Sequence, residues 1–386
     1  MTSDGYSLRN RVKLVRGGDE YFTLLHELVS KARRTIHLQF YIFDDDETGT
    51  QLKEALINAS RRGVDVFLHA DGYASQVLSR QFIAGMKESG IRFKWFEPLF
   101  KSRKFYFGRR MHHKVVVVDG IYSMTGGINI SNRYNDMSDN PAWMDLAIFC
   151  EGEASLQLHN LCRNMWGKPY KDKLDLQAAE EFFRQIPAKD YHSVRVRRND
   201  WVKRKNEVTR SYFYMFHHAE KEIIIMCSYF LPGRAFRRAM SKAVKRGVKI
   251  KTILAGPSDV MIAKHAERYL YDWLLKNNIE IYEYQKTVLH AKTAVYDSRW
   301  VTAGSYNVNN ISAYASLEIN LDIRNKPFAL HIKTELEKII RQDCRKITPD
   351  NYISSTRFFR RLWQRLCFSF INTMLSLFTF YFKQEE

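Results

Sequence analysis

One spaced pattern occurs twice in the chain, and it limits the folds that the chain can adopt. Both copies read H-x-K-x4-D-x6-G-[GS]-x-N, and neither copy contains an insertion. The first copy runs from His112 to Asn129, and the second runs from His290 to Asn307. The distance between the copies is far longer than the roughly 20 to 50 residues of a short-repeat solenoid, so the pattern predicts a duplicated domain.

The segments around the two copies come into register and predict the same order of elements in each half. An alternating apolar segment at 35–43 corresponds to one at 222–230, as expected for buried strands. Each is followed by a helical stretch that stops at a glycine, Gly63 in the first half and Gly247 in the second. The order β-α-β-α-β-β is therefore expected twice, which predicts an α/β fold of mixed sheets flanked by helices.

The length and the local composition set the expected domain boundaries. At 386 residues the chain is long enough for two cores. Between about Trp166 and Trp201, polar and charged residues dominate and strand periodicity is lost. We therefore expect a first domain at 1–166, a linker or insertion at 167–200, a second domain at 201–350 and a basic, hydrophobic segment at 351–386.

Basic residues outnumber acidic residues by 61 to 42, which gives a formal net charge of +19 at pH 7. Such a surface favours a polyanionic partner, either nucleic acid or an anionic membrane. A basic protein whose charges are simply solvated has the same composition. The cations form three clusters, which are Lys101, Arg103, Lys104, Arg109 and Arg110; Arg195, Arg197, Arg198, Lys203, Arg204 and Lys205; and Arg357, Arg360, Arg361 and Arg365.

The C-terminal tail differs in composition from the rest of the chain. From Leu366 to Phe382 it is rich in aromatic and aliphatic residues, and it follows the third basic cluster. It is slightly short for a membrane span and is interrupted by polar residues, so it is typical of an amphipathic helix or hairpin lying in one leaflet. A final helix that packs on the globular core is the alternative interpretation.

The spacing inside each motif indicates a shared catalytic face. Side chains alternate along a strand, so His112 and Lys114 point to one face, as do His290 and Lys292, whereas His113 points away and is interpreted as structural. An imidazole can attack phosphorus or transfer a proton near neutral pH. Lysine and asparagine side chains can hold the phosphate oxygens. Two such motifs predict a two-histidine reaction at a phosphodiester.

The duplicated motif resembles that of the phospholipase D superfamily, and the resemblance covers residues 10 to 350. Within that superfamily the chain is similar to bacterial cardiolipin synthases, in particular to the B type, which lacks N-terminal membrane spans. The segments that carry this similarity are Ala70-Asp71-Gly72-Tyr73, Arg110-Met111-His112 and Leu231-Pro232-Gly233. The resemblance implies two domains related by a pseudo-twofold axis that share one active-site cleft, with no metal and no cofactor required.

The resemblance also implies a role for each motif residue. His112 would attack phosphorus and form a phosphatidyl-histidine, and His290 would protonate the leaving alcohol and deprotonate the incoming one. The implied set is catalytic His112, Lys114, Asp119, His290, Lys292 and Asp297; phosphate-binding Asn129, Asn307, Gly127 and Ser305; and histidine-orienting Asp145 and Glu318.

Two positions in this set depart from a simple assignment. Asp119 and Asp297 belong to the motif, but each stands where a strand runs into a turn, which favours fixing the loop over touching phosphate. Gly127 stands where the second copy has Ser305, so the first copy has no hydroxyl at that position. Backbone amides can serve there instead.

The leading hypothesis is a membrane-associated phosphatidyltransferase of the cardiolipin synthase type, which joins two phosphatidylglycerol molecules and releases glycerol. Its expected partners are anionic phospholipid and the membrane surface, without nucleic acid, at the cytoplasmic side of the inner membrane. A phosphodiesterase or nuclease of the same superfamily is the alternative, with the basic clusters holding nucleic acid. A lipid-binding scaffold with a degenerate site is a third hypothesis, and the intact motifs disfavour it.

Overall fold

The computed structural model describes residues 2, 4–98, 109–167, 173–309, 312, 316–355 and 358–383. Four cations of the predicted basic clusters, Lys101, Arg103, Lys104 and Arg357, lie outside the described residues. The chain divides into two compact units, which we describe separately. The first unit comprises Met1–Arg197, Ala303–Ser305 and Leu317–Arg324, and the second comprises Arg198–Thr302, Tyr306–Ser316 and Asn325–Glu386.

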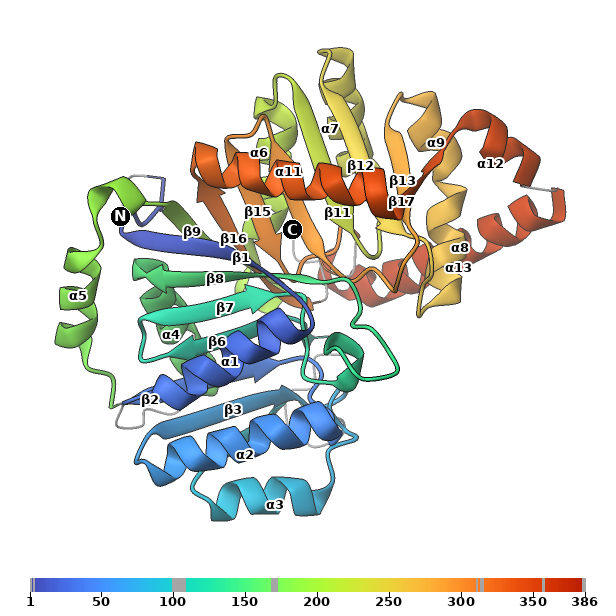
Figure 1. Cartoon of the computed structure of the whole chain (residues 1–386). Helices are drawn as coiled ribbons and strands as arrows, with labels where there is room; N and C mark the ends of the chain where they lie inside the picture. The colour runs from blue at the N-terminus through green and yellow to red at the C-terminus, as the bar shows by residue number, and fades with distance from the viewer. Residues whose placement is uncertain are drawn as a thin grey trace. The chain divides into compact units, whose positions relative to one another are not determined.

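A seven-stranded mixed sheet forms the centre of the first unit, with the strand order β1-β8-β7-β6-β2-β3-β4 (Figure 1). Strands β2, β3 and β4 run parallel to one another, and the remaining pairs are antiparallel. The bounds are β1 (Asn10–Arg16), β2 (Thr35–Phe40), β3 (Asp65–Asp71), β4 (Arg92–Phe96), β6 (Lys114–Val118), β7 (Tyr122–Gly126) and β8 (Leu146–Gly152).

Helices cover both faces of this sheet, which explains why β2, β3 and β6 are buried along their whole length. Ile36 and Leu38 of β2 face the core formed with α1 and α2, whereas Gln39 faces α4, where its side chain donates to the Cys162 carbonyl at 3.2 Å. The helices of this unit are α1 (Asp19–Lys31), α2 (Glu47–Arg61), α3 (Arg80–Glu88), α4 (Glu153–Trp166) and α5 (Leu176–Gln185), with the short 3-10 helices η1 (Asn132–Tyr134) and η2 (Ala188–Asp190).

The second sheet has ten strands, and its path runs β10-β9-β16-β15-β14-β11-β12-β13-β17, with β5 (Arg110–Met111) paired to β16. From β9 to β13 this order repeats that of the first sheet from β1 to β4, strand for strand. The predicted duplication is therefore confirmed. The bounds are β9 (Ser193–Asp200), β10 (Lys205–Asn206), β11 (Glu222–Cys227), β12 (Lys249–Ala255), β13 (Glu280–Tyr284), β14 (Lys292–Tyr296), β15 (Trp300–Gly304), β16 (Ser316–Arg324) and β17 (Cys344–Ile347).

The helix ends repeat as well. Gly63 follows α2 at a φ of +87° and Gly247 follows α7 at +94°, a left-handed conformation that glycine adopts without steric cost. Both predicted helix stops are confirmed. The helices after β9 are η3 (Trp201–Lys203), α6 (Glu207–His218), α7 (Arg234–Lys245), α8 (Met261–Tyr269), α9 (Tyr271–Lys276), α11 (Lys326–Asp343), α12 (Pro349–Ser355) and α13 (Phe358–Lys383).

The segment 167–200, which its composition predicts as a linker or insertion, contains α5 and the strand β9. Arginines occupy alternate positions of this strand and conceal its periodicity. Arg195 and Arg197 lie 2.9 and 3.7 Å from a carboxylate oxygen of Asp322, which is fully buried. These two cations of the second basic cluster therefore neutralise a buried carboxylate of their own unit. The unit boundaries also differ from the predicted ones, since the first unit includes Leu317–Arg324.

The C-terminal tail is helical and packs on its own unit through part of its surface. On α13, Gln364 and Cys367 are buried, and the rings of Phe368 and Tyr269 of α8 lie 4.9 Å apart. Other apolar side chains of α13 remain exposed, among them Phe359 at 80% and Trp363 at 52%. No helix within the described ranges is long and apolar enough to cross a membrane. The described part of the tail thus combines core packing with an exposed apolar surface.

Candidate active site

The first motif histidine is held by a buried carboxylate. Nδ1 of His112 lies 3.0 Å from Oε1 and 3.1 Å from Oε2 of Glu318. An ionised carboxylate can only accept hydrogen bonds, so Nδ1 carries the proton and the imidazole lone pair is on Nε2. Glu318 is completely buried, whereas 16% of the His112 side chain is exposed. The pair therefore holds the tautomer that nucleophilic attack through Nε2 needs.

Backbone and side-chain contacts fix this pair further. The amides of His112 and His113 both donate to the Leu317 carbonyl at 3.0 Å, where β5 runs beside β16. The Ser305 hydroxyl donates to Oε2 of Glu318 and accepts the Ile319 amide at 3.1 Å. The Ser305 hydroxyl therefore holds the carboxylate that orients His112, and its predicted phosphate-binding role stays a prediction. Glu318 follows the second motif in the sequence, yet it contacts the histidine of the first.

A second carboxylate explains the glycine in the first copy. A Cβ atom on Gly127 would lie 2.4 Å from Oδ1 and 2.5 Å from Oδ2 of Asp145, closer than real Cβ contacts. Asp145 is itself buried, and its Oδ1 accepts the amide of Leu146 at 2.8 Å. In each copy, the size of the residue at this motif position corresponds to the length of the carboxylate side chain beside it. The smaller residue, Gly127, stands beside the carboxylate of the shorter side chain, Asp145, and Ser305 stands beside Glu318.

The motif lysines are buried and turn back to their own histidines. Lys114 Nζ donates to the His112 carbonyl at 2.5 Å, and Lys292 Nζ donates to the His290 carbonyl. The Lys114 ammonium also lies 5.1 Å from the ring centroid of Tyr41, and that ring lies 4.9 Å from the His112 ring. The prediction that each histidine and lysine share a face is supported by these contacts. Each motif places the ammonium group of its lysine beside the backbone carbonyl of its histidine.

The motif asparagines use their carbonyl oxygens to hold loops. Oδ1 of Asn129 accepts the Ile42 amide at 3.0 Å, and its Nδ2 donates to the Tyr134 hydroxyl at 2.9 Å. Oδ1 of Asn307 accepts the Ser228 hydroxyl at 2.8 Å. An asparagine amide has two N–H groups, so phosphate binding by either residue would use the amide nitrogen. That role stays a prediction.

The carboxylates of Asp119 and Asp297 bind backbone amides. Each follows the end of its strand, β6 or β14, that lies away from the motif histidine, and each carboxylate accepts three consecutive backbone amides. The amides that donate to Asp119 are those of Arg33, Arg34 and Thr35, at 2.7 to 2.9 Å, and those that donate to Asp297 are those of Glu220, Lys221 and Glu222, at 2.8 to 2.9 Å. Both aspartates fix the start of the neighbouring strand, which supports the loop-fixing interpretation, and their catalytic role stays a prediction.

Replacement of Asp119 by alanine should lower the free energy of unfolding by about 2–3 kcal/mol, because three amides lose a charged acceptor. Turnover per folded molecule should be unchanged. Urea denaturation measures the first effect and activity at low temperature the second. Asp139→Ala, at an exposed carboxylate, is the matched control. A variant of full stability that has lost turnover would return Asp119 to the catalytic set.

Two residues that the motif does not contain also position His112. The buried carboxylate of Asp71 accepts the Met111 amide at 2.8 Å and Arg110 Nη1 at 3.3 Å. Arg110 Nη2 donates in turn to the Glu97 carbonyl at 3.0 Å. These contacts anchor β5, which leads directly into His112. The sequence signal was present in the Ala70–Tyr73 and Arg110–His112 segments, although their spacing does not reveal that they meet.

The second motif occupies the equivalent position in the second sheet. His290 is 6% exposed and precedes β14, as His112 precedes β6 in the equivalent sheet. Asn307 and Ser228 link the loop after β15 to the end of β11, as Asn129 and Ile42 link the equivalent elements of the first unit. In the described ranges, no group of three or more histidine, cysteine, aspartate or glutamate side chains forms a metal site.

The two sheets share one topology, and in each of them a motif histidine comes just before the strand that carries the motif lysine. This arrangement defines an enzyme of the phospholipase D type. The chain belongs to the family described as cardiolipin synthase, PLD-like domain, whose model matches residues 25–166 and 212–340. The family predicted from the motif is thereby confirmed.

Individual relatives agree with this assignment. The chain is 31% identical to cardiolipin synthase B of Shigella flexneri over 370 residues, which is 92% of this chain and 85% of that protein. It is 32% identical to cardiolipin synthase B of Salmonella typhi over 356 residues, or 89% of this chain and 83% of that protein. The crystal structure of phosphatidylserine synthase from Haemophilus influenzae is similar in fold, with a TM-score of 0.72, 14% identity and coverage of 94% of this chain and 93% of that one.

Proposed function

We propose that the chain transfers the phosphatidyl group of one phosphatidylglycerol molecule to the glycerol hydroxyl of another and releases glycerol. Two lines of support meet in this proposal. The relatives named cardiolipin synthase B are similar over most of both chains. The observation that carries the mechanism is the contact of His112 with the buried Glu318, beside the buried ammonium of Lys114.

In the first step, Nε2 of His112 attacks phosphorus and forms a P–N bond. The bond between phosphorus and the oxygen of the leaving glycerol breaks, and that oxygen takes a proton from His290. The imidazolium character that develops on His112 is stabilised by Glu318, whose carboxylate is held by Ser305. Lys114 and Lys292 neutralise the growing charge on the non-bridging phosphate oxygens.

In the second step, His290 takes the proton from the glycerol hydroxyl of a second phosphatidylglycerol. That oxygen attacks phosphorus, the P–N bond breaks, and His112 is restored. The proposed role of His290 rests on the equivalence of the two motifs and of the strands that carry them. One imidazole is suited to both proton transfers because its ordinary pKa lies near neutral pH.

The direct test is incubation of the purified chain with phosphatidylglycerol vesicles, followed by mass analysis of the lipids and assay of free glycerol. Cardiolipin and glycerol in equal amounts are expected. Phosphatidic acid in place of cardiolipin would mean hydrolysis, which would contradict the transfer. A parallel assay with single-stranded DNA and RNA tests the nuclease alternative. The pairing of Arg195 and Arg197 with Asp322 already weakens that alternative, because it removes two cations from the presumed nucleic-acid surface.

We also propose that the enzyme attaches peripherally to the inner membrane, at its cytoplasmic side. The support comes from α13, where apolar side chains on one surface remain exposed to solvent. The exposed set is Phe359, Leu362, Trp363, Leu366 and Phe370, whose exposed fractions range from 46% to 80%. An aromatic and aliphatic surface next to arginines is suited to the headgroup region of a bilayer.

Replacement of Phe359, Leu362 and Leu366 together by glutamine should move most of the protein from the membrane fraction to the supernatant. These side chains are exposed, so their change removes apolar area available to the bilayer without opening the core. The matched control replaces three exposed apolar residues of other helices and loops, Val77, Leu176 and Leu330. Equal release of both triple variants, or release of neither, would contradict attachment through α13.

A further inference from the structure

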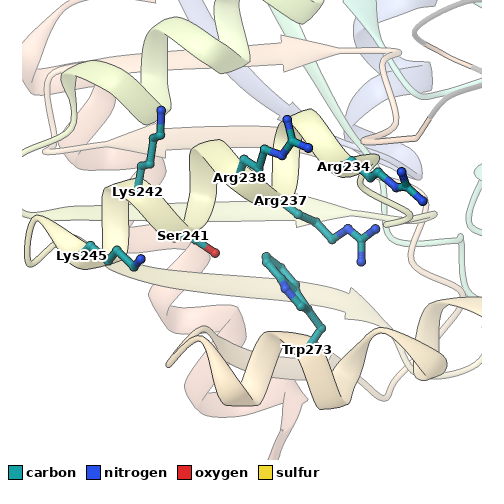
Figure 2. Close-up of a pocket in the computed structure, with 7 residues that line it drawn as sticks. All are labelled: Arg234, Arg237, Arg238, Ser241, Lys242, Lys245 and Trp273. Carbon is teal, nitrogen blue, oxygen red and sulfur yellow. The ribbon is translucent and has the colours of Figure 1, made fainter.

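A cationic pocket lies in the second unit, on residues that the motif does not include. It has a volume of about 370 Å³ and opens to solvent between α7 and α9 (Figure 2). Five cations and two other side chains line it, and no carboxylate is among them. The lining residues are Arg234, Arg237, Arg238, Ser241, Lys242, Lys245 and Trp273.

The positive charge of this pocket is not balanced by ion pairs in the part of the chain that the structure describes. Among the residues that the structure describes, the five cations make no ion pair with an aspartate or glutamate. Burial and the adjacent Arg234 charge lower the pKa of Arg237, and the effect of Tyr269, which acts in the opposite direction, is smaller. Its Nε atom is buried and has no hydrogen-bond partner in the described part of the chain. A cluster of like charges that lacks counter-ions attracts an anion.

The side of the pocket opposite the cations is aromatic. The guanidinium of Arg237 lies 5.7 Å from the ring centroid of Trp273, and the two side chains face each other across the space between the helices (Figure 2). This contact holds Arg237 in place without neutralising it. A half-buried indole with an apolar body and a polar edge is typical of protein surfaces at the headgroup region of membranes.

We propose that the α7–α9 pocket binds the phosphate groups of anionic phospholipids at the bilayer surface, as a docking site separate from the catalytic motifs. The charged face extends from Arg234 to Lys245, which is about 16 Å along a helix. One small phosphate cannot reach both ends of such a face, whereas several neighbouring headgroups can. The proposal rests on the proposed function for its choice of lipid, because a phosphatidylglycerol substrate resides in such a surface.

The test compares two double variants in which two exposed cations of the same unit become neutral. Arg238→Gln with Lys242→Gln changes the pocket, and Lys338→Gln with Arg341→Gln changes α11 by the same net charge. Binding is measured by sedimentation with vesicles of phosphatidylcholine containing phosphatidylglycerol. Each charge lost at an anionic surface weakens binding about fivefold, so the pocket variant should bind about 25-fold more weakly. The α11 variant should change little.

Several outcomes would overturn the docking site. Equal weakening of both double variants would mean that only the total charge matters, and unchanged binding of both would mean that the pocket is not used. Arg238→Lys with Lys242→Arg keeps the charges and should retain binding. If inorganic phosphate or glycerol 3-phosphate binds in solution and depends on the same two residues, the pocket is a site for a small soluble phosphate. Loss of RNA binding with intact vesicle binding would assign it to nucleic acid.

A separate measurement distinguishes failure of docking from failure of the proposed function. Turnover is followed with short-chain phosphatidylglycerol below its micelle concentration, where no surface is present. The pocket variant should then react at the rate of the unmodified protein. If the unmodified protein forms no cardiolipin but the vesicle results hold, the docking site stands and the proposed function fails. If the pocket variant loses turnover on the dispersed lipid as well, the pocket is part of the active site and docking is the wrong assignment.

Discussion

Replacement of His112 by alanine is expected to reduce the formation of cardiolipin by at least about 10⁴-fold while the protein stays folded. Without this imidazole no nitrogen is held by Glu318, so the P–N bond of the first step cannot form. Mass analysis of the lipid product measures the loss, and thermal unfolding checks the fold. His331→Ala, at an exposed histidine of α11, is the control and should keep full turnover.

The same variant tests the covalent step itself. Brief incubation of the unmodified protein with phosphatidylglycerol labelled at phosphorus should leave an acid-labile label on the protein. The label should be absent from His112→Ala and present in the His331→Ala control. Near-normal turnover of His112→Ala, or a label that persists in it, would exclude His112 as the nucleophile. The roles of the two motif histidines would then have to be exchanged or abandoned.

The second large effect is expected for Glu318→Gln, with a fall in kcat of about 10³- to 10⁴-fold. The glutamine side chain has nearly the same shape, but it carries no charge to stabilise the imidazolium and can bind the ring in the wrong tautomer. KM should change less than threefold, because Glu318 is buried behind His112 and is not exposed to the lipid. Ser305→Ala removes a hydrogen bond to Glu318 and should cost about 10- to 100-fold in kcat.

The order of these variants is the informative result. His112→Ala should be the most severe, Glu318→Gln the next, and Ser305→Ala the mildest. If Ser305→Ala instead raises KM and leaves kcat unchanged, its hydroxyl binds substrate, as the motif first suggested. If Glu318→Gln is as active as the unmodified protein, the contact with His112 is only structural.

Much of the fold could be predicted because local patterns and global topology agree. The segment predicted as a strand at 35–43 is β2, and its counterpart at 222–230 is β11, since apolar residues buried on both faces form recognisable runs. The strand β9 is not recognisable from its polarity pattern, because arginines occupy alternate positions where apolar residues would indicate a strand. Their charges made the segment look like a linker, although Arg195 is bound to the buried Asp322. A pattern of polarity cannot show a partner that is distant in the sequence.

The sequence predicts which residues form the candidate site, but it does not predict which of them contact one another. Spacing identified His112 and Lys114, because two residues on one strand face the same way. It could not show that the carboxylate of Glu318 binds the histidine of the other copy, since that contact depends on where β16 lies. The cationic face of α7 is not predictable from the sequence for a similar reason. They recur at helical intervals, so they form no run in the sequence, and they gather only on the folded helix.

The dependence of His112 on β16 has a consequence for the biosynthesis of the enzyme. The residue that orients this imidazole is 206 positions further along the chain. A nascent polypeptide that has already exposed the first motif at the ribosome therefore still lacks an aligned nucleophile. A prematurely terminated product that carries only the first motif is therefore expected to be catalytically silent.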